Sequence, residues 1–219
     1  MDFQLSDDQR AIADMAGSLF GAALTAPHPP GYPGVQGVSG VIALIREHYQ
    51  RNFPHALAKL DEQIAAAKNP YQVAFEHLQG RGSADDANAI IRRAVSSAYT
   101  GAEPPEPRDS VAWAKRERDL DGWHLPPWLQ ALGILHANSP PQLAELVLTT
   151  NFDPLIQVAI RRAGGQARTS VLSKDGALDQ NHGAECHVIH LHGHSTAVDT
   201  LHTDVQLRHP RPQLKDSLR

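Results

Sequence analysis

An apolar run that passes directly into small polar residues and then into a helix is the feature that most constrains this chain. Residues 145–160 read ELVLTTNFDPLIQVAI. The apolar run predicts a buried strand at 146–150, and the apolar spacing after Pro154 predicts a helix at 154–163. The segment CHVIHLHGHS at 186–195 repeats the plan of a strand that ends in polar residues. Strands that alternate with helices favour a parallel sheet, whose carboxyl edge would collect both sets of polar groups.

The middle of the chain predicts helices separated by short polar breaks. Ser83 has the character of an N-cap, and Asp85 and Asp86 would lie in the first turn, where the helix dipole favours acidic groups. Segments 8–20 and 169–173 are weaker, because 8–20 fits either a helix or a strand and 169–173 is a weak strand. Helices are expected at 41–50, 54–68, 69–80, 83–99 and 126–137, and one or two short ones at 201–219.

These elements predict an α/β fold made of a single domain. Residues 1–46 and 141–219 would form a Rossmann-like parallel sheet with its helices, and 47–140 would be a mostly helical insert. We expect residues 52–140 to lie over the carboxyl edge of the sheet. Glycine and proline residues make the segment after Phe20 a loop.

The composition narrows the class of protein. With 41% hydrophobic and 20% charged residues, the chain is typical of soluble globular proteins. Its formal charge of −4 and pI of about 6.3 do not favour direct binding to nucleic acid. We expect no membrane span or signal peptide, and a cytoplasmic location. Cys186 is the only cysteine, which excludes an internal disulfide and a multi-cysteine zinc site.

Two interpretations of the polar cluster at 149–153 remain open from the residues alone. Thr150 or Asn151 can cap the helix that follows, with Asp153 favouring its dipole, and such caps are common. A cap uses one side chain, however, whereas Thr149 adds a fourth polar group at the point where the strand leaves the core. The alternative is therefore a binding site.

The histidines of the second strand also allow two interpretations. His190, His192 and His194 alternate, so they share a strand face and are candidate ligands for a transition metal. No carboxylate or cysteine stands at ligand spacing, which disfavours a metal. We therefore expect His190 and His194 to be solvated or hydrogen-bonded and dispensable. His192, followed by a glycine, would be exposed at the strand end and able to act as a general base.

Three motifs in order make this chain resemble the sirtuin superfamily. The chain has GAA at 21–23 and GYP at 31–33, where sirtuins carry a Gly-Ala-Gly loop and a Gly-Ile-Pro segment. It has TTNFD at 149–153, where sirtuins carry Thr-Gln-Asn-x-Asp, and HG at 192–193 after the second strand. The resemblance extends over residues 15–45 and 145–219. On their own, the small residues after Phe20 indicate a tight turn or a phosphate-binding loop.

The resemblance implies NAD as substrate and no metal. Loop 21–25 would hold the pyrophosphate, Thr150 and Asn151 would contact the nicotinamide ribose, and Asp153 would hold the amide. His192 would act as base or would order the ribose hydroxyls and an attacking water. The implied catalytic residues are thus His192 and Asn151. The implied cofactor-binding residues are Gly21, Ala22, Ala23, Thr25, Pro33, Thr150, Asp153 and Gly193.

Within that superfamily the chain is most similar to prokaryotic sirtuin-like NAD hydrolases of antiviral defence. Protein deacylases of the superfamily carry a four-cysteine zinc ribbon, which one cysteine cannot build. A second alternative is a module that binds NAD or another nucleotide without turnover, favoured by Ala23 in place of a glycine and by the end of the chain at Arg219. Related domains continue further, so we expect the last part of the core to be missing. We expect such a protein to form a homo-oligomer or to act with a partner sensor protein.

Overall fold

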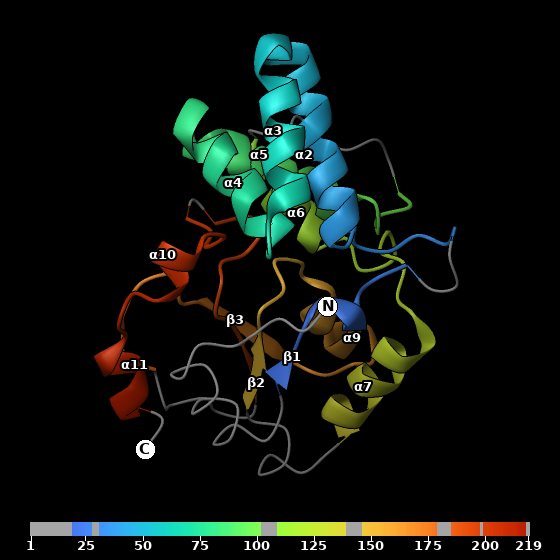
Figure 1. Ribbon diagram of the computed structural model, residues 1–219. Coiled ribbons are helices and arrows are strands. Elements are labelled where there is room, and N and C mark those ends of the chain that lie inside the picture. The colour runs from blue at the N-terminus through green and yellow to red at the C-terminus, as the bar shows by residue number, and fades with distance from the viewer. Residues whose placement is uncertain are drawn as a thin grey trace.

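Four parallel strands form one sheet in the part of the chain that the structure describes. The computed structural model describes residues 19–27, 31–101, 109–138, 146–178, 185–197 and 199–217. The strands lie in the order β1-β2-β4-β3. Figure 1 labels β1, β2 and β3 of this sheet. Their bounds are β1 Leu19–Phe20, β2 Leu146–Thr149, β3 Ala167–Val171 and β4 Cys186–His190.

This arrangement agrees with the predicted α/β class and parallel sheet. β2 pairs with β4 in register, with Leu148 opposite Ile189, and β3 lies on the far side of β4. The strand predicted at 146–150 ends one residue earlier, and the weak strand predicted at 169–173 begins earlier, at Ala167. Of the ambiguous segment 8–20, residues 8–18 lie outside the described residues.

The helices predicted from spacing are present, with one addition. Helix α6 (Ser110–Glu117) was not expected, and the side chain of Asp109 caps it by accepting from the Ala112 N–H. None of the described helices is long and apolar enough to cross a membrane. The others are α2 Val38–Asn52, α3 Pro54–Ala66, α4 Pro70–Arg81, α5 Ala84–Ser96, α7 Pro127–Asn138, α9 Leu155–Arg162, α10 Asp204–Leu207 and α11 Pro212–Ser217, and a 3-10 turn, η1, spans Ala22–Leu24.

Local capping explains where several helices begin. Ser83 accepts a hydrogen bond from the backbone N–H of Asp86, whose carboxylate accepts one from the N–H of Ser83, so the predicted N-cap of α5 is a full capping box. The side chain of Asn69 caps α4 by accepting a single hydrogen bond from the N–H of Gln72, and Pro70 follows at the first helical position. These signals depend only on neighbouring residues, and they are therefore readable from the sequence.

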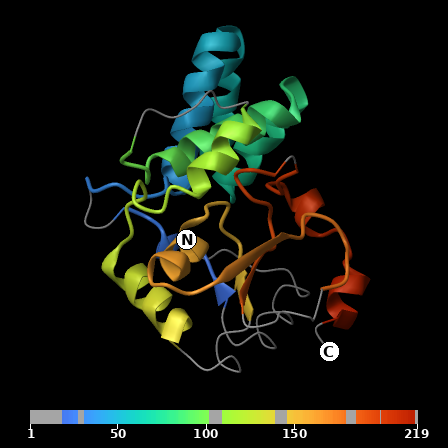
Figure 2. The same ribbon diagram turned by 180° about the vertical axis from the view of Figure 1, so that it is seen from behind.

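The strands β2 and β4 send alternate side chains into two separate cores. Val147 and Val188 face a core that continues through α9 and α7 into the helices above the sheet. Leu148 and Ile189 face a smaller core, which Leu214 of α11 helps to close. The two-residue period of a strand produces this division. Seen from behind, α7 and the C-terminal helices α10 and α11 lie on opposite sides of the molecule (Figure 2).

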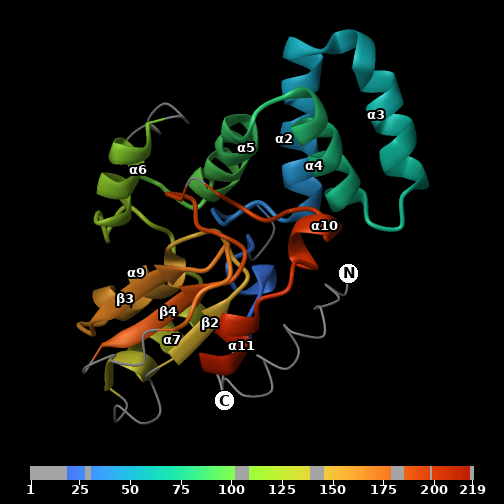
Figure 3. The same ribbon diagram turned by 90° about the vertical axis from the view of Figure 1, so that its left-hand side faces the viewer.

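Helices α2, α3, α4 and α5 pack against one another above the sheet, as a side view shows (Figure 3). The Nε–H of Arg92 in α5 donates to the carbonyl oxygen of Ser195 at 2.7 Å, which joins these helices to the segment after β4. Between 52 and 140 the described residues form no strand beyond one isolated bridge, between Tyr99 and Trp123. The helical character of this region is confirmed, whereas its division from the core at 47 and 140 stays a prediction.

Two glycines in helices allow a sharp test of this packing. A Cβ at Gly133 of α7 would lie 2.4 Å from the carbonyl oxygen of Ala159 in α9, so the two backbones touch there. Gly133→Ala should therefore reduce the free energy of unfolding by about 1–3 kcal/mol. Gly80 of α4 has open space around the same position. Gly80→Ala should raise it by about 0.5–1 kcal/mol, because alanine favours a helix. Urea unfolding measures both, and shifts of the same sign would contradict the close α7–α9 contact.

Candidate functional site

A cavity of about 640 Å³ opens between the carboxyl edge of the sheet and the helices. This volume is in the range of small-molecule sites, and most of the lining is apolar, as is usual for such sites. Two of the ten predicted site residues, Pro33 and Gly193, do not line it. The other eight do: Gly21, Ala22, Ala23, Thr25, Thr150, Asn151, Asp153 and His192.

A buried hydroxyl joins the loop after β1 to the end of β2. The Thr25 hydroxyl donates to Oδ2 of Asp153 at 2.9 Å. It accepts a hydrogen bond from Nδ2 of Asn151 at 3.2 Å. All three side chains are buried. Two segments that are far apart in sequence are therefore held together by one polar cluster at the floor of the cavity.

Asn151 has one polar atom left over. Its Nδ2 group is used by Thr25, but Oδ1 is buried without a hydrogen-bond partner in the described part of the chain. An unpaired buried acceptor is costly, at about 1–3 kcal/mol, unless a ligand or water satisfies it. Asn151 is one of the residues that line the cavity, so its side-chain amide is a candidate contact for a hydroxyl or amino group of a bound molecule.

The capping interpretation of the polar cluster is wrong for Thr150 and Asn151. Helix α9 begins at Leu155 and neither side chain caps it. The N-cap residue is Pro154, and Oδ1 of Asp153 accepts from the N–H of Leu155, the first residue of α9, at 3.1 Å. Burial raises the pKa of Asp153 to about 6, while the hydrogen bonds from Leu155 and Thr25 oppose that rise.

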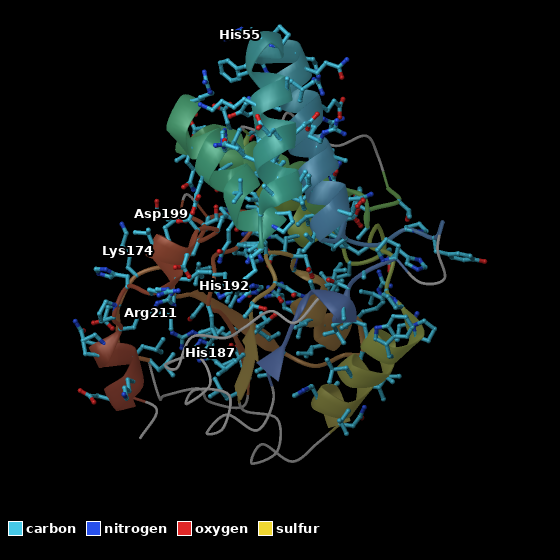
Figure 4. All side chains as sticks on the ribbon, viewed as in Figure 1. His55, Lys174, His187, His192, Asp199 and Arg211 are labelled. Carbon is cyan, nitrogen blue, oxygen red and sulfur yellow. The ribbon has the colours of Figure 1, made fainter. Side chains whose placement is uncertain are left out.

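His192 lies just beyond the end of β4, at the level where the sheet meets the helices (Figure 4). The expectation that it is exposed is wrong, because the helices cover the strand end and leave its side chain 2% exposed. Burial, aided by the positive charge of Arg211, lowers the pKa of His192 to about 3. The imidazole is therefore neutral at physiological pH and offers one donor and one acceptor.

The backbone conformation at position 193 requires a glycine. Its φ of +111° is one that side-chain-bearing residues rarely adopt, and a Cβ there would lie 2.8 Å from the carbonyl oxygen of Asp199. The glycine therefore lets the chain turn back beneath Asp199 and Thr200. Its effect on the cavity is indirect, through the position of His192.

The other two histidines of the motif do not join His192 in a cluster. His190 and His194 are buried, with ring centroids 4.5 Å apart, and both rings lie within hydrogen-bonding distance of the Gln157 amide. Neither lines the cavity. Over the described ranges, no three histidine, cysteine, aspartate or glutamate side chains are grouped so as to hold a metal ion.

The upper wall of the cavity was not predicted from the sequence. Tyr71 of α4 lines it, and its hydroxyl lies 3.0 Å from Nδ1 of His202, whose ring stacks on Phe75 with centroids 3.8 Å apart. Trp128 of α7 also lines the cavity and donates to the carbonyl oxygen of Leu24. Periodicity shows that these helices have an apolar face, but not which part of it meets the sheet. Further apolar residues of this wall are Val38, Val41, Ile91, Ala94 and Val95.

One comparison with known proteins found a family model that matches the part of the chain from β2 to α10. The family model of the SIR2-like domain matches residues 145–209. This match includes β2, α9, β4 and the segment from His192 to His202, and it covers less than a third of the chain. Searches of curated proteins and of solved structures gave no match.

The Thr25 hydroxyl can be tested against a matched threonine. Thr25→Val leaves Asn151 Nδ2 without an acceptor and Asp153 Oδ2 without a donor, so it should reduce the free energy of unfolding by about 1–3 kcal/mol. The hydroxyl of Thr169 in β3 has no partner among the described residues. Thr169→Val should therefore be close to neutral, within about 0.5 kcal/mol. Thermal or urea unfolding of both variants checks this, and equal losses would show that the Thr25 cluster contributes nothing specific.

The buried histidines make stability depend on pH with a definite sign. Burial lowers the pKa of five histidines: to about 4 for His190, to about 3 for His192 and His202, and below the usual range for His194 and the less buried His77. In the unfolded chain these histidines take up protons near pH 6.5. Their contribution to the free energy of unfolding is therefore fully present above that pH and is lost as the pH falls toward 4.

The raised pKa values of Asp153 and Glu117 act in the opposite direction, but these are two groups, whereas five histidines have lowered pKa values. We expect the free energy of unfolding to fall steadily from about pH 7 to about pH 5, by roughly 1.4 kcal/mol per pH unit for each net proton. Urea midpoints measured across this range check the sign. A constant midpoint would contradict the neutral, buried histidines.

Proposed function

We propose that this chain hydrolyses NAD at the bond between nicotinamide and ribose. The observation that carries the proposal is the unpaired Oδ1 of Asn151, in the same cavity wall as the neutral side chain of His192. Both residues lie in the segment matched by the SIR2-like model, and SIR2-like domains use NAD. The family match supports an NAD-related, sirtuin-type function, and we propose hydrolysis as the specific reaction.

The residues present fit a dinucleotide. The cavity volume of about 640 Å³ suits a ligand of that size, and the loop at 21–25 lines it with small side chains. Gly21, Ala22 and Ala23 are exposed, so their backbone groups can approach a pyrophosphate closely. Ala23 already carries a methyl group in place of the glycine of other sirtuins, and its exposed position leaves room for it.

The chain's own groups can favour cleavage without a metal. Asn151 Oδ1 can accept from a ribose hydroxyl, and His192 can accept from a second hydroxyl or orient a water molecule. Hydrolysis joins the water oxygen to the ribose carbon, breaks the carbon–nitrogen bond and releases nicotinamide and a proton. Because cleavage is oxocarbenium-like, positioned dipoles and an oriented water should contribute most of the rate.

His192 would act here as a hydrogen-bond acceptor more than as a strong base. A group whose pKa is about 3 holds a proton poorly at neutral pH. Burial, aided by the charge of Arg211, keeps His192 neutral, so it can accept a hydrogen bond throughout the physiological range. This role agrees with ordering the ribose hydroxyls, one of the two roles implied by the resemblance.

The finer structural and biological assignments follow from the same proposal. A parallel sheet with a cavity at its carboxyl edge supports the Rossmann-like description. A role in antiviral defence, through depletion of cellular NAD, rests on the resemblance of the motifs and on the helices that cover the site. A partner sensor protein or self-association would then control the activity.

Nicotinamide release tests the proposal directly. Asn151→Ala and His192→Ala should each slow release by about 100-fold or more, since each removes a polar contact at the reacting ribose. His55→Ala and Asn138→Ala serve as matched controls, because both side chains are exposed and do not line the cavity. Figure 4 shows His55, at the N-terminal end of α3, far from His192. Release that is unchanged in both site variants would sink the mechanism.

One observation favours binding without turnover as the second candidate. The low pKa of His192 makes it a weak base, and a site of acceptors can recognise a nucleotide without cleaving it. Calorimetry with NAD beside the release assay separates the two functions: heat of binding with no nicotinamide supports a sensor. Nicotinamide release that requires an acetyl-lysine peptide would instead support protein deacylation.

A further inference from the structure

His190 lies beneath the cavity and contacts the backbone of Asn151. It is the last residue of β4, and its side chain is fully buried without lining the cavity. Its Nδ1 lies 2.7 Å from the carbonyl oxygen of Asn151. A carbonyl oxygen only accepts hydrogen bonds, so Nδ1 carries the proton and donates it to this contact.

Gln157 of α9 holds the ring of His190 in that state. The Gln157 amide nitrogen lies 3.0 Å from Nε2 of His190, and an amide nitrogen only donates. Nε2 must therefore be the unprotonated nitrogen of a neutral ring. Burial, which lowers the pKa of His190 to about 4, favours the same state. The same amide nitrogen lies 3.4 Å from Nε2 of His194, so one glutamine contacts both rings.

The contact at the Asn151 carbonyl fixes the backbone of a residue whose side-chain amide has a hydrogen-bond partner for Nδ2 but not for Oδ1. The Asn151 N–H donates to Oγ1 of Thr149 at 3.0 Å, and its carbonyl accepts from His190. The backbone N–H and the carbonyl of Asn151 are thus both hydrogen-bonded to side chains. In a strand, backbone groups of a neighbouring strand would take these places. Asn151 Oδ1 has no partner of its own among the described residues, so the orientation of this amide depends on how the Asn151 backbone is fixed.

We propose that His190 is a positioning residue, which fixes the peptide of Asn151 through Nδ1 and thereby aims the Asn151 side chain at the ligand. The role rests on the proposed function, because the ligand is taken to be NAD. It replaces the expectation that His190 is dispensable. A misplacement of about 1 Å at a reacting group can reduce rate about 100-fold, so loss of this contact should be visible in turnover.

Two substitutions of His190 separate positioning from simple packing. In His190→Asn the amide nitrogen can stand where Nδ1 stood and still donate to the Asn151 carbonyl. In His190→Gln the amide nitrogen reaches the place of Nε2, and the donor to the carbonyl is lost. We expect nicotinamide release to fall by at least about tenfold in the glutamine variant and by much less in the asparagine variant. Equal losses in the two variants, at equal thermal stability, would overturn the proposal.

His187 supplies the matched control. It is a buried histidine on the same strand, its Nε2 lies 2.7 Å from Oγ of Ser170, and it does not line the cavity. Figure 4 places it further than His192 from the helices α2–α5 above the sheet. His187→Asn and His187→Gln should therefore not differ in turnover. A difference between them as large as that at His190 would show that the amide length, and not the contact with Asn151, decides activity.

A double-variant cycle tests whether His190 acts through Asn151. Added to Asn151→Ala, the His190→Gln change should reduce turnover by no more than about threefold, because its target is already gone. A full additional loss would overturn the proposal. If His190→Gln does not fold, His190→Asn decides alone: retained turnover supports the role, and a loss as large as that of Asn151→Ala contradicts it.

An NAD-independent readout keeps this proposal distinct from the proposed function. The side-chain amide of Asn151 gives its own NMR signals, which should shift in His190→Gln and stay near their original positions in His190→Asn. If the unsubstituted chain neither binds nor cleaves NAD, the proposed function fails and these signals alone decide the positioning. Signals that are unmoved in the glutamine variant would overturn it.

Discussion

One hydroxyl group holds the two halves of the candidate site together. Thr25 belongs to the loop after β1, whereas Asn151 and Asp153 follow β2, and the Thr25 hydroxyl bonds to both side chains at once. Because these groups are buried, each would be costly without its partner. The position of the loop, the direction of the Asn151 amide and the place of the Asp153 carboxylate just before α9 therefore depend on a single donor–acceptor arrangement.

The elements that could be predicted from the sequence are those specified by neighbouring residues. The capping box of Ser83 and the proline after Asn69 mark helix starts that the structure reproduces. The apolar runs of β2 and β4 predicted their strands and their parallel pairing. Helix α6 was missed although Asp109 caps it, because its short sequence has a weak apolar pattern. In each case a helix or strand was predicted where its caps or its apolar pattern were clear, and was missed where they were weak.

The site was predictable only in part, because half of it is made by contacts between distant segments. The motifs brought residues such as Thr25, Asn151 and His192 to one cavity, as expected for strand ends at one edge of a sheet. The burial of His192 was not foreseen, since it results from helices that reach over the strand end. The contribution of Tyr71 and His202 to the wall depends likewise on how α4 packs, which no pattern within α4 encodes.

The upper wall also has a consequence for how such a protein can change over evolutionary time. The polar groups that would recognise the reacting part of a ligand come from the strand ends, whereas α5 contributes Ile91, Ala94 and Val95, whose side chains make no hydrogen bonds. A larger or smaller residue at Ala94 would alter the shape of the chamber and leave the cluster around Thr25 untouched. Ligand size and reaction chemistry are thus encoded in separate stretches of the chain, and selection can adjust the first without disturbing the second.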